Sequence, residues 1–301
     1  MASSVQPKDK TVNVNGINLH YLDWGNEGKP KILFLHGLRG HCHSWDDVSS
    51  EFCQDYHIIA LDQRGRGESD WAPGGDYSSG SYVADLESFC EEVGFDKFTL
   101  IGHSMGGRNS MAFAGNNARK LESLVIVDIG PDLDPRGSIR ITKEIVDVPE
   151  EFDSFEDMYA HQAKQNRFCS ERVLRRRLTY ASKELPDGKY GWRYDLEIRE
   201  QRRNNTGSKQ HDLWANLPGI ECPVLIVRGT KTDTLALETA EKMLEALPNG
   251  RLIHVDKAAH MVFEDNPADF IEALHGFLDL SLIHISEPTR PERIGFAGVG
   301  G

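Results

Sequence analysis

Short apolar runs alternate along the chain with segments whose apolar residues recur at helical spacing. Runs of this kind without polar interruption are typical of strands buried on both faces. They lie at residues 31–35, 57–61, 98–101, 124–127, 224–227 and 251–255. Helical spacing is found between them, at 82–93, 235–247 and 267–278, and a hairpin around Asn15-Gly16 is predicted at the start. The pattern predicts an α/β domain with a mostly parallel sheet and helices on both faces.

The alternation stops between residues 132 and 216, where the chain is polar, mostly helical in pattern and without an obvious strand. We therefore expect a helical cap at 132–216, inserted into a core formed by residues 1–131 and 217–279. Lys and Arg outnumber Asp and Glu between Arg167 and Arg203. We expect these cations mainly on solvated helix faces in ion pairs, and the alternative is that one or two of them meet an anionic substrate.

The segment from Leu280 to Arg290 reads LSLIHISEPTR. It resembles the translation of a transposon-end sequencing adapter. We expect the natural reading frame to end near Asp279 and residues 280–301 to be a non-native tail, as found in draft-genome or metagenomic sequences.

Charge and composition narrow the possible partners. The 301 residues carry a formal net charge of −13, which argues against nucleic acid and anionic membranes as partners. The N-terminus lacks an apolar signal core, and no run approaches the roughly 20 apolar residues of a membrane span. Five scattered cysteines predict reduced thiols in a cytoplasmic protein. The oligomeric state is left open.

The sequence Gly102-His103-Ser104-Met105-Gly106 lies between a predicted strand and a predicted helix. Gly-x-Ser-x-Gly in this context indicates a nucleophile elbow, a sharp turn that exposes a strained serine. The two glycines allow the close approach that the turn requires. The N–H of Met105 would lie at the positive end of the helix.

A serine nucleophile requires a base, and the base requires a carboxylate that orients it. His260 follows the last predicted strand, and Asp233 follows the strand before it. The carboxyl ends of parallel strands converge on one edge of a sheet, so Ser104, His260 and Asp233 are predicted to meet there. Asp128 also ends a strand and is the alternative acid.

The chain resembles the α/β-hydrolase superfamily over residues 11–278. The resemblance is carried by the elbow, the order Ser…Asp…His, the His36-Gly37 turn and the loop Asp62-x-Arg64-Gly65-x-Gly67-x-Ser69. It implies an eight-stranded, mostly parallel sheet with a cap after the sixth strand. The residue before the histidine is often glycine in this superfamily and is Ala259 here, a change that should be tolerated.

The resemblance also implies the roles of the residues. Ser104 would be the nucleophile, His260 the general base and Asp233 the orienting acid, while the N–H groups of Leu38 and Met105 would bind the oxyanion. Some members place the acid at the position of Asp128. A serine at the elbow disfavours the dehalogenase and epoxide-hydrolase branches, which use a carboxylate nucleophile.

The predicted activity is cleavage of small to medium carboxylic esters through an acyl-enzyme, without metal or organic cofactor. Three alternatives remain: a C–C bond hydrolase of a keto acid, a cofactor-free perhydrolase, and a receptor-like binding protein with little turnover. Asp62 and Arg64 are expected to hold their loop, and His41-Cys42-His43 is not expected to bind metal. The residues expected around the substrate pocket are His36, His103, Ile129, Trp192 and Met261.

Overall fold

The computed structural model describes residues 5–166, 168–204, 206 and 211–286, with the side chains of 280–286 left aside. An eight-stranded sheet with the order β1-β2-β4-β3-β5-β6-β10-β11 forms its centre. The strands are β1 (Lys8–Val14), β2 (Ile17–Asp23), β3 (Lys31–Leu35), β4 (His57–Leu61), β5 (Phe98–His103), β6 (Leu121–Val127), β10 (Val224–Gly229) and β11 (Gly250–Val255). Only the pairings of β2 with β1 and β4 are antiparallel, so the predicted mostly parallel sheet is confirmed.

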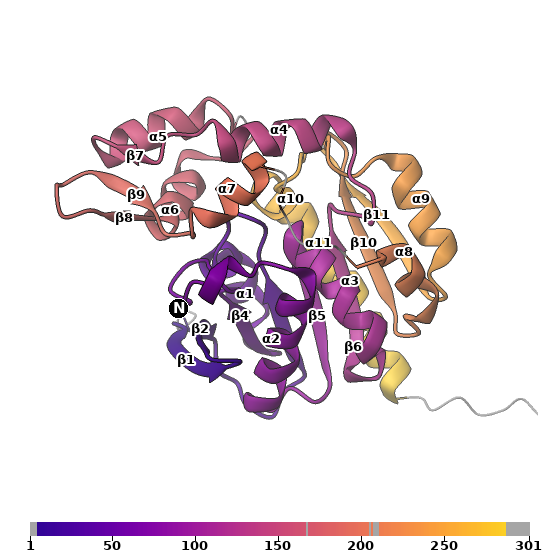
Figure 1. The fold of residues 1–301 in the computed structure, drawn as a ribbon. Helices are drawn as coiled ribbons and strands as arrows, with labels where there is room; N and C mark the ends of the chain where they lie inside the picture. Colours follow the sequence, from indigo (N-terminus) through magenta and orange to yellow (C-terminus); the bar gives the residue numbers. More distant parts are fainter. Residues whose placement is uncertain (1–4, 167, 205, 207–210, 287–301) are drawn as a thin grey trace, which may run out of the picture.

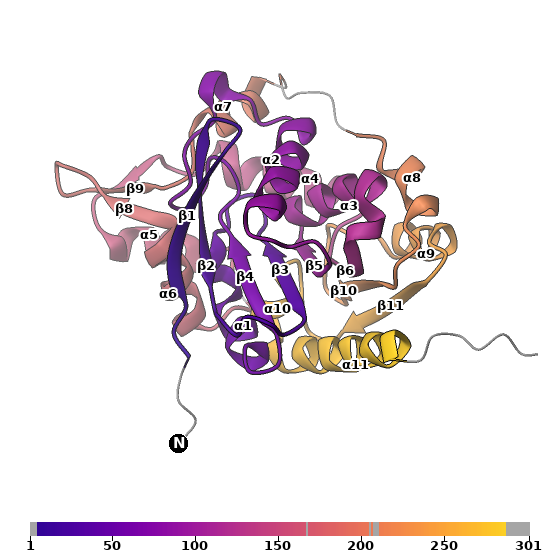
Figure 2. The same ribbon diagram turned by 90° about the horizontal axis from the view of Figure 1, so that it is seen from below.

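Helices cover both faces of this sheet, because successive strand residues point to opposite sides. In β3, Ile32 and Phe34 belong to one apolar cluster, and Leu33 and Leu35 belong to the other. The helices α1 (Asp46–Phe52) and α11 (Pro267–Ser286) lie on one face. The other face carries α2 (Ser79–Glu92), α3 (Met105–Asn117) and α9 (Leu237–Ala246). Figures 1 and 2 show the resulting three layers.

Short helices and one tight turn complete this part of the fold. The predicted hairpin turn is present between β1 and β2, where Asn15 and Gly16 have φ values of 51° and 81°. Positive φ at both positions is what a two-residue hairpin turn of this kind requires. The short helices are η1 (Cys42–Trp45), η2 (Pro73–Gly75), η3 (Ala118–Lys120), η4 (Leu217–Gly219) and α10 (Val262–Asp265).

The segment that follows β6 forms a cap with its own apolar core. Its helices are α4 (Pro135–Val146), α5 (Phe155–Ala163), α6 (Glu171–Ala181) and α7 (Glu197–Asn204). Figure 1 shows α4, α5 and α6 on one side of the main sheet. The apolar core of the cap includes Phe152, Met158, Leu174, Leu178 and Trp192.

Two details of this segment differ from the sequence prediction. The cap contains a small sheet, β7-β9-β8, formed by Glu151–Phe152, Tyr190–Trp192 and Ser182–Glu184. Strands of two or three residues are too short to show an alternating pattern, so the expectation of no strand was wrong. The last helix, α8 (Leu213–Asn216), packs against α3, and Leu213 is buried in the main core.

The C-terminal helix α11 continues past Asp279 to Ser286. Residues 287–301 lie outside the described part of the chain, so the non-native origin of the tail stays a prediction. Among the described residues, no helix combines the length and the apolar character needed to cross a membrane.

The loop after β4 is held by a buried carboxylate. Asp62 accepts hydrogen bonds from the N–H of Cys42 at 2.6 Å, the N–H of Glu68 at 3.0 Å and Nδ1 of His20 at 2.8 Å. Burial alone would raise the pKa of Asp62, but these bonds, led by that from His20, outweigh it and lower the pKa to about 2. Arg64 in the same loop makes two bonds to Asp85, at 2.5 and 2.7 Å.

Replacing Asp62 by Asn should lower the free energy of unfolding by about 2–4 kcal/mol at pH 7, because the new NH₂ group faces buried donors. The folded-state pKa lies below the ordinary value of 3.8, so the contribution of the carboxylate is fully present above pH 4. It is lost as pH falls from about 4 to 2. Denaturant unfolding should therefore show a smaller difference in the free energy of unfolding between wild type and D62N at pH 3 than at pH 7.

The matched control is D70N, which changes an exposed carboxylate in the same loop. We expect D70N to change stability by less than about 1 kcal/mol. A D62N protein as stable as wild type would contradict the structural role of Asp62.

Candidate active site

Ser104 lies in the sharp turn between β5 and α3, with φ of 53°. A Cβ atom at Gly102 would lie 2.5 Å from the carbonyl oxygen of Gly106, and a Cβ at Gly106 would lie 2.4 Å from that of Leu35. Only glycine therefore fits at these two positions. The predicted elbow is present, with a strained serine at its tip.

His260 joins Ser104 to a buried carboxylate. Its Nε2 lies 2.9 Å from Oγ of Ser104, and its Nδ1 lies 2.9 Å from Oδ2 of Asp128. Because a carboxylate only accepts, Nδ1–H donates to Asp128, which leaves Nε2 to accept the proton of the serine hydroxyl. The three side chains come from the loops after β5, β6 and β11 and have the geometry of a nucleophile, a base and an orienting acid.

The prediction that Asp233 lies against His260 was wrong. The carboxylate of Asp233 instead binds Arg140 of α4 through two bonds, Nε to Oδ2 at 2.7 Å and Nη2 to Oδ1 at 2.8 Å. The Arg140 guanidinium lowers the pKa of Asp233. Both aspartates follow parallel strands and reach the same edge of the sheet, so strand order alone did not separate them.

Two residues at the end of β10 and in the loop after it, Gly229 and Thr232, donate hydrogen bonds to Asp128. Asp128 is fully buried, and its Oδ1 accepts from the N–H of Gly229 at 3.0 Å. Its Oδ2 accepts from the hydroxyl of Thr232 at 2.5 Å as well as from His260. These bonds hold the buried carboxylate in place and satisfy its oxygens.

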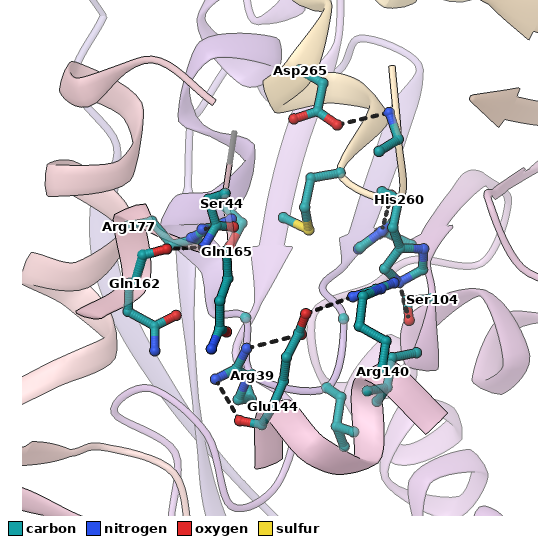
Figure 3. Close-up of a pocket in the computed structure, with 18 of the residues that line it drawn as sticks. Arg39, Ser44, Ser104, Arg140, Glu144, Gln162, Gln165, Arg177, His260 and Asp265 are labelled. Atoms are coloured by element: carbon teal, nitrogen blue, oxygen red, sulfur yellow. Dashed lines mark hydrogen bonds and ion pairs between the residues drawn. The ribbon is translucent and has the colours of Figure 1, made fainter. Parts of the chain in front are cut away.

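A cavity of about 350 Å³ lies between the cap and this edge of the sheet, and Ser104 and His260 border it (Figure 3). Leu38 borders it too, and the preceding residue, Gly37, packs so closely that an added Cβ would lie 3.3 Å from Cβ of Ser104. Met105 is the first residue of α3, so its N–H lacks an intrahelical acceptor. The backbones of both predicted oxyanion donors are thus next to the serine.

Three of the five predicted pocket residues, His103, Trp192 and Met261, border the cavity. His103 donates from Nε2 to the carbonyl of His260 at 2.9 Å, and burial holds its pKa well below the ordinary range. It is therefore a neutral support for the backbone of His260 and does not compete with it as a base.

The other two predicted pocket residues do not border the cavity. His36 donates from Nδ1 to the carbonyl of Gly37 at 2.7 Å and accepts at Nε2 from the N–H of Gln63 at 3.0 Å. Burial lowers the pKa of His36 to about 4, so it stays neutral and holds two loops together. Ile129 is buried in the main core. Both expectations were wrong because adjacency in sequence to the site does not place a side chain in its cavity.

Comparison with known proteins identifies the family of this fold. The family model for the alpha/beta hydrolase fold matches residues 30–267. The chain belongs to the alpha/beta hydrolase family. It is 29% identical over 260 residues to the 3-hydroxybutyrate-oligomer hydrolase of Cupriavidus necator, a match that covers 82% of this chain and 88% of that one.

Two further comparisons extend over most of this alpha/beta hydrolase. An esterase of Mycobacterium tuberculosis is 28% identical over 264 residues, covering 86% of this chain and 85% of the relative. The crystal structure of E-2-(acetamidomethylene)succinate hydrolase superposes with a TM-score of 0.82 at 23% identity, covering 91% of this chain and all of that one. The chain is therefore a hydrolase with esterase relatives, and the superposition supports the fold.

Most of the cap arginines of this hydrolase lie in ion pairs at the surface, as predicted. Arg175 pairs with Glu156 and Glu171, and Arg176 pairs with Asp47. Arg177 differs because it borders the cavity, where Nη1 donates to Glu264 at 2.6 Å and Nη2 donates to Asn166 at 2.6 Å. Its terminal nitrogens are thus committed to protein acceptors.

Sequence reasoning missed the polar wall of the cavity. These unpredicted residues are Arg39, Ser44, Arg140, Glu144, Gln162, Gln165, Asn166 and Arg177. Arg39 could have been predicted to border the cavity, because it directly follows the predicted oxyanion donor Leu38. The cap residues could not, since helical spacing does not show which polar side chain faces a cavity.

One group in the described part of the chain has metal-ligand chemistry, namely His20, Cys42 and Asp62. It fits a metal poorly, because both oxygens of Asp62 already accept hydrogen bonds. His41 and His43 point elsewhere: Nε2 of His41 lies 3.0 Å from the carbonyl of Arg177, and His43 stacks on Tyr180.

Proposed function

We propose that this hydrolase cleaves small to medium carboxylic esters through a covalent acyl-enzyme. The observation that carries the proposal is the double contact of His260, with Ser104 at 2.9 Å on one side and Asp128 at 2.9 Å on the other. This double contact supports the roles of nucleophile for Ser104, base for His260 and orienting acid for Asp128.

In the first step, Oγ of Ser104 attacks the ester carbonyl while Nε2 of His260 takes the hydroxyl proton. The resulting oxyanion would be bound by the N–H groups of Leu38 and Met105. Each such donor is typically worth about 10²–10³ in rate. His260 then protonates the leaving alcohol, and a water activated by the same nitrogen hydrolyses the acyl-enzyme.

Two further observations support an ester as the substrate. The relatives include a protein named esterase and one named for hydrolysis of 3-hydroxybutyrate oligomers. The cavity, at about 350 Å³, is near the lower end of the range for small-molecule sites, about 300–1,000 Å³. A long acyl chain would not fit within it.

Turnover of 4-nitrophenyl esters of increasing chain length tests this proposal. We expect kcat/KM to peak at or below C8 and to fall at least about tenfold by C16, because the longer chain leaves the cavity and its apolar surface stays in water. The measurement is initial rates under monomeric substrate conditions, with the Ser104→Ala variant as background.

Each rival activity gives a different result in the same assay series. A maximum at C12 or longer would indicate a lipase, and faster cleavage of a vinylogous keto acid would indicate a C–C hydrolase. Peracid formation that outcompetes hydrolysis in the presence of peroxide would indicate a perhydrolase. Saturable ligand binding without turnover of any ester would indicate a receptor-like protein.

A further inference from the structure

Arg39 and Gln162 belong to the polar wall of the cavity and are part of neither the triad nor the oxyanion hole. Arg39 lies in the loop after β3, directly after Leu38, and Gln162 lies on α5 in the cap. They therefore approach the cavity from the core and from the cap. Figure 3 shows both in the cavity wall, across the view from Ser104 and His260.

Arg39 is held rigidly but is not saturated. Its Nη1 donates to the backbone carbonyl of Glu144 at 3.1 Å, and its Nη2 donates to Oε2 of Glu144 at 3.2 Å. The guanidinium also lies 6.0 Å from the ring of Trp192. A guanidinium has five N–H donors, and its bonds to described residues use two of them. The other three have no hydrogen bond to the described residues.

Gln162 presents an amide with no protein acceptor. The residue is only 3% exposed, and its Nε2 has no hydrogen-bond partner among the described residues. Leaving such a donor unpaired costs free energy, so an unpaired buried amide in a cavity wall calls for an explanation. An acceptor on the substrate would supply the missing bond.

The nearby carboxylate of Glu144 does not accept a hydrogen bond from Gln162, because arginines bind both of its oxygens. Oε1 of Glu144 is bound by Arg140 at 2.8 Å, and Arg140 in turn holds Asp233. Glu144 is thereby kept on one side of Arg39. The second cavity arginine, Arg177, also makes two bonds, to Glu264 and Asn166, but both are 2.6 Å long and therefore tighter than the bonds of 3.1 and 3.2 Å that hold Arg39.

We propose that Arg39 and Gln162 form a carboxylate subsite, so that the preferred substrate is an ester that also carries one free carboxylate. A carboxylate would accept from the unused guanidinium N–H groups and from the amide of Gln162. In a chain of net charge −13, the overall field repels anions, so a preference for them would have to come from a local site. The subsite rests on the proposed esterase function, because the carboxylate is assigned to an ester substrate.

A matched pair of substrates tests the subsite: 4-nitrophenyl hydrogen adipate, which carries a carboxylate, and 4-nitrophenyl methyl adipate, in which that group is esterified. We expect wild type to prefer the acid by at least about tenfold in kcat/KM. Arg39→Gln should lower kcat/KM for the acid by about 10–100-fold, mainly through KM, since a charged hydrogen bond is worth about 1.5–3 kcal/mol. Its kcat/KM for the methyl ester should change less than threefold.

Two further variants keep the result interpretable. Gln162→Leu should lower kcat/KM for the hydrogen adipate ester by about five- to tenfold and leave that for the methyl ester unchanged. The melting temperature should not fall, because the lost amide had no partner. Arg176→Gln is the control, since it removes the same charge from a surface pair with Asp47 outside the cavity. It should leave the preference for the acid unchanged.

Equal losses on both substrates in R39Q, or a wild-type preference for the methyl ester, would overturn the subsite while leaving the esterase proposal intact. An R176Q effect as large as that of R39Q would also overturn it, because a diffuse field would then account for the preference. If neither ester is cleaved, the esterase proposal fails. Calorimetric binding of adipate to wild type and not to R39Q would in that case still demonstrate the subsite.

Discussion

Ser104→Ala should lower kcat for a short-chain nitrophenyl ester by about six powers of ten, to the level of residual catalysis by the rest of the site. The substitution removes the atom that forms the acyl bond and leaves His260 and Asp128 in place. It retains Cβ, so the strained backbone at φ of 53° is unchanged, and the melting temperature should stay within a few degrees. Labelling by a fluorophosphonate should be lost together with turnover.

Ser44→Ala provides the matched control for that experiment. Ser44 borders the same cavity, but its hydroxyl accepts from the N–H of His41 and has no contact with His260. We expect S44A to retain activity within about threefold and to be labelled normally. Activity of S104A within tenfold of wild type would refute the assignment of Ser104 as the nucleophile.

Asp128→Asn should lower kcat by about 10⁴-fold with little change in KM. The amide NH₂ of Asn would face Nδ1 of His260 and favour the tautomer that carries its proton on Nε2. In that tautomer Nε2 cannot accept the proton of Ser104, although the side chain retains its shape. The measurement is kcat on a short-chain ester, supported by an unfolding curve to show that D128N is folded.

Asp233→Asn is the comparison that decides between the two candidate acids. Asp233 contacts Arg140 and has no hydrogen bond to His260 among the described residues. We therefore expect kcat of D233N on the same ester to fall by less than about tenfold. Any loss should come from weakened attachment of α4 to the core. If kcat fell more in D233N than in D128N, Asp233 and not Asp128 would be the residue that orients His260.

The elbow and the position of His260 were predictable from the sequence because each is marked by a pattern that can be read along the chain. The Gly-x-Ser-x-Gly motif and its strand-to-helix context can be read along the chain and pointed to Ser104, although the atoms that exclude a Cβ at Gly106 belong to Leu35 and His36. His260 follows the last strand of a clear strand–helix alternation, and parallel strands place such loops at one edge.

The cavity wall was not predictable in the same way. Gln162 and Arg177 lie on cap helices whose polar positions look alike in the sequence, and only the packing of cap on core separates surface ion pairs from cavity residues. His36 illustrates the converse. It adjoins the oxyanion loop in sequence, yet its two ring nitrogens are used in backbone bonds that keep it out of the cavity.

By itself, the sequence predicted the mostly parallel α/β sheet and an inserted cap, and it named Ser104 and His260 as the candidate nucleophile and base. These predictions follow from apolar periodicity and from a short motif at the end of a strand, both of which can be read along the chain. The choice of Asp128 over Asp233 was decided only by the tertiary structure. Arg140 of the cap binds the carboxylate of Asp233. Gly229 and Thr232 hold the carboxylate of Asp128 against His260. Bonds between segments about a hundred residues apart leave no local pattern, so a chain with two aspartates at one sheet edge requires its fold to show which one orients the base.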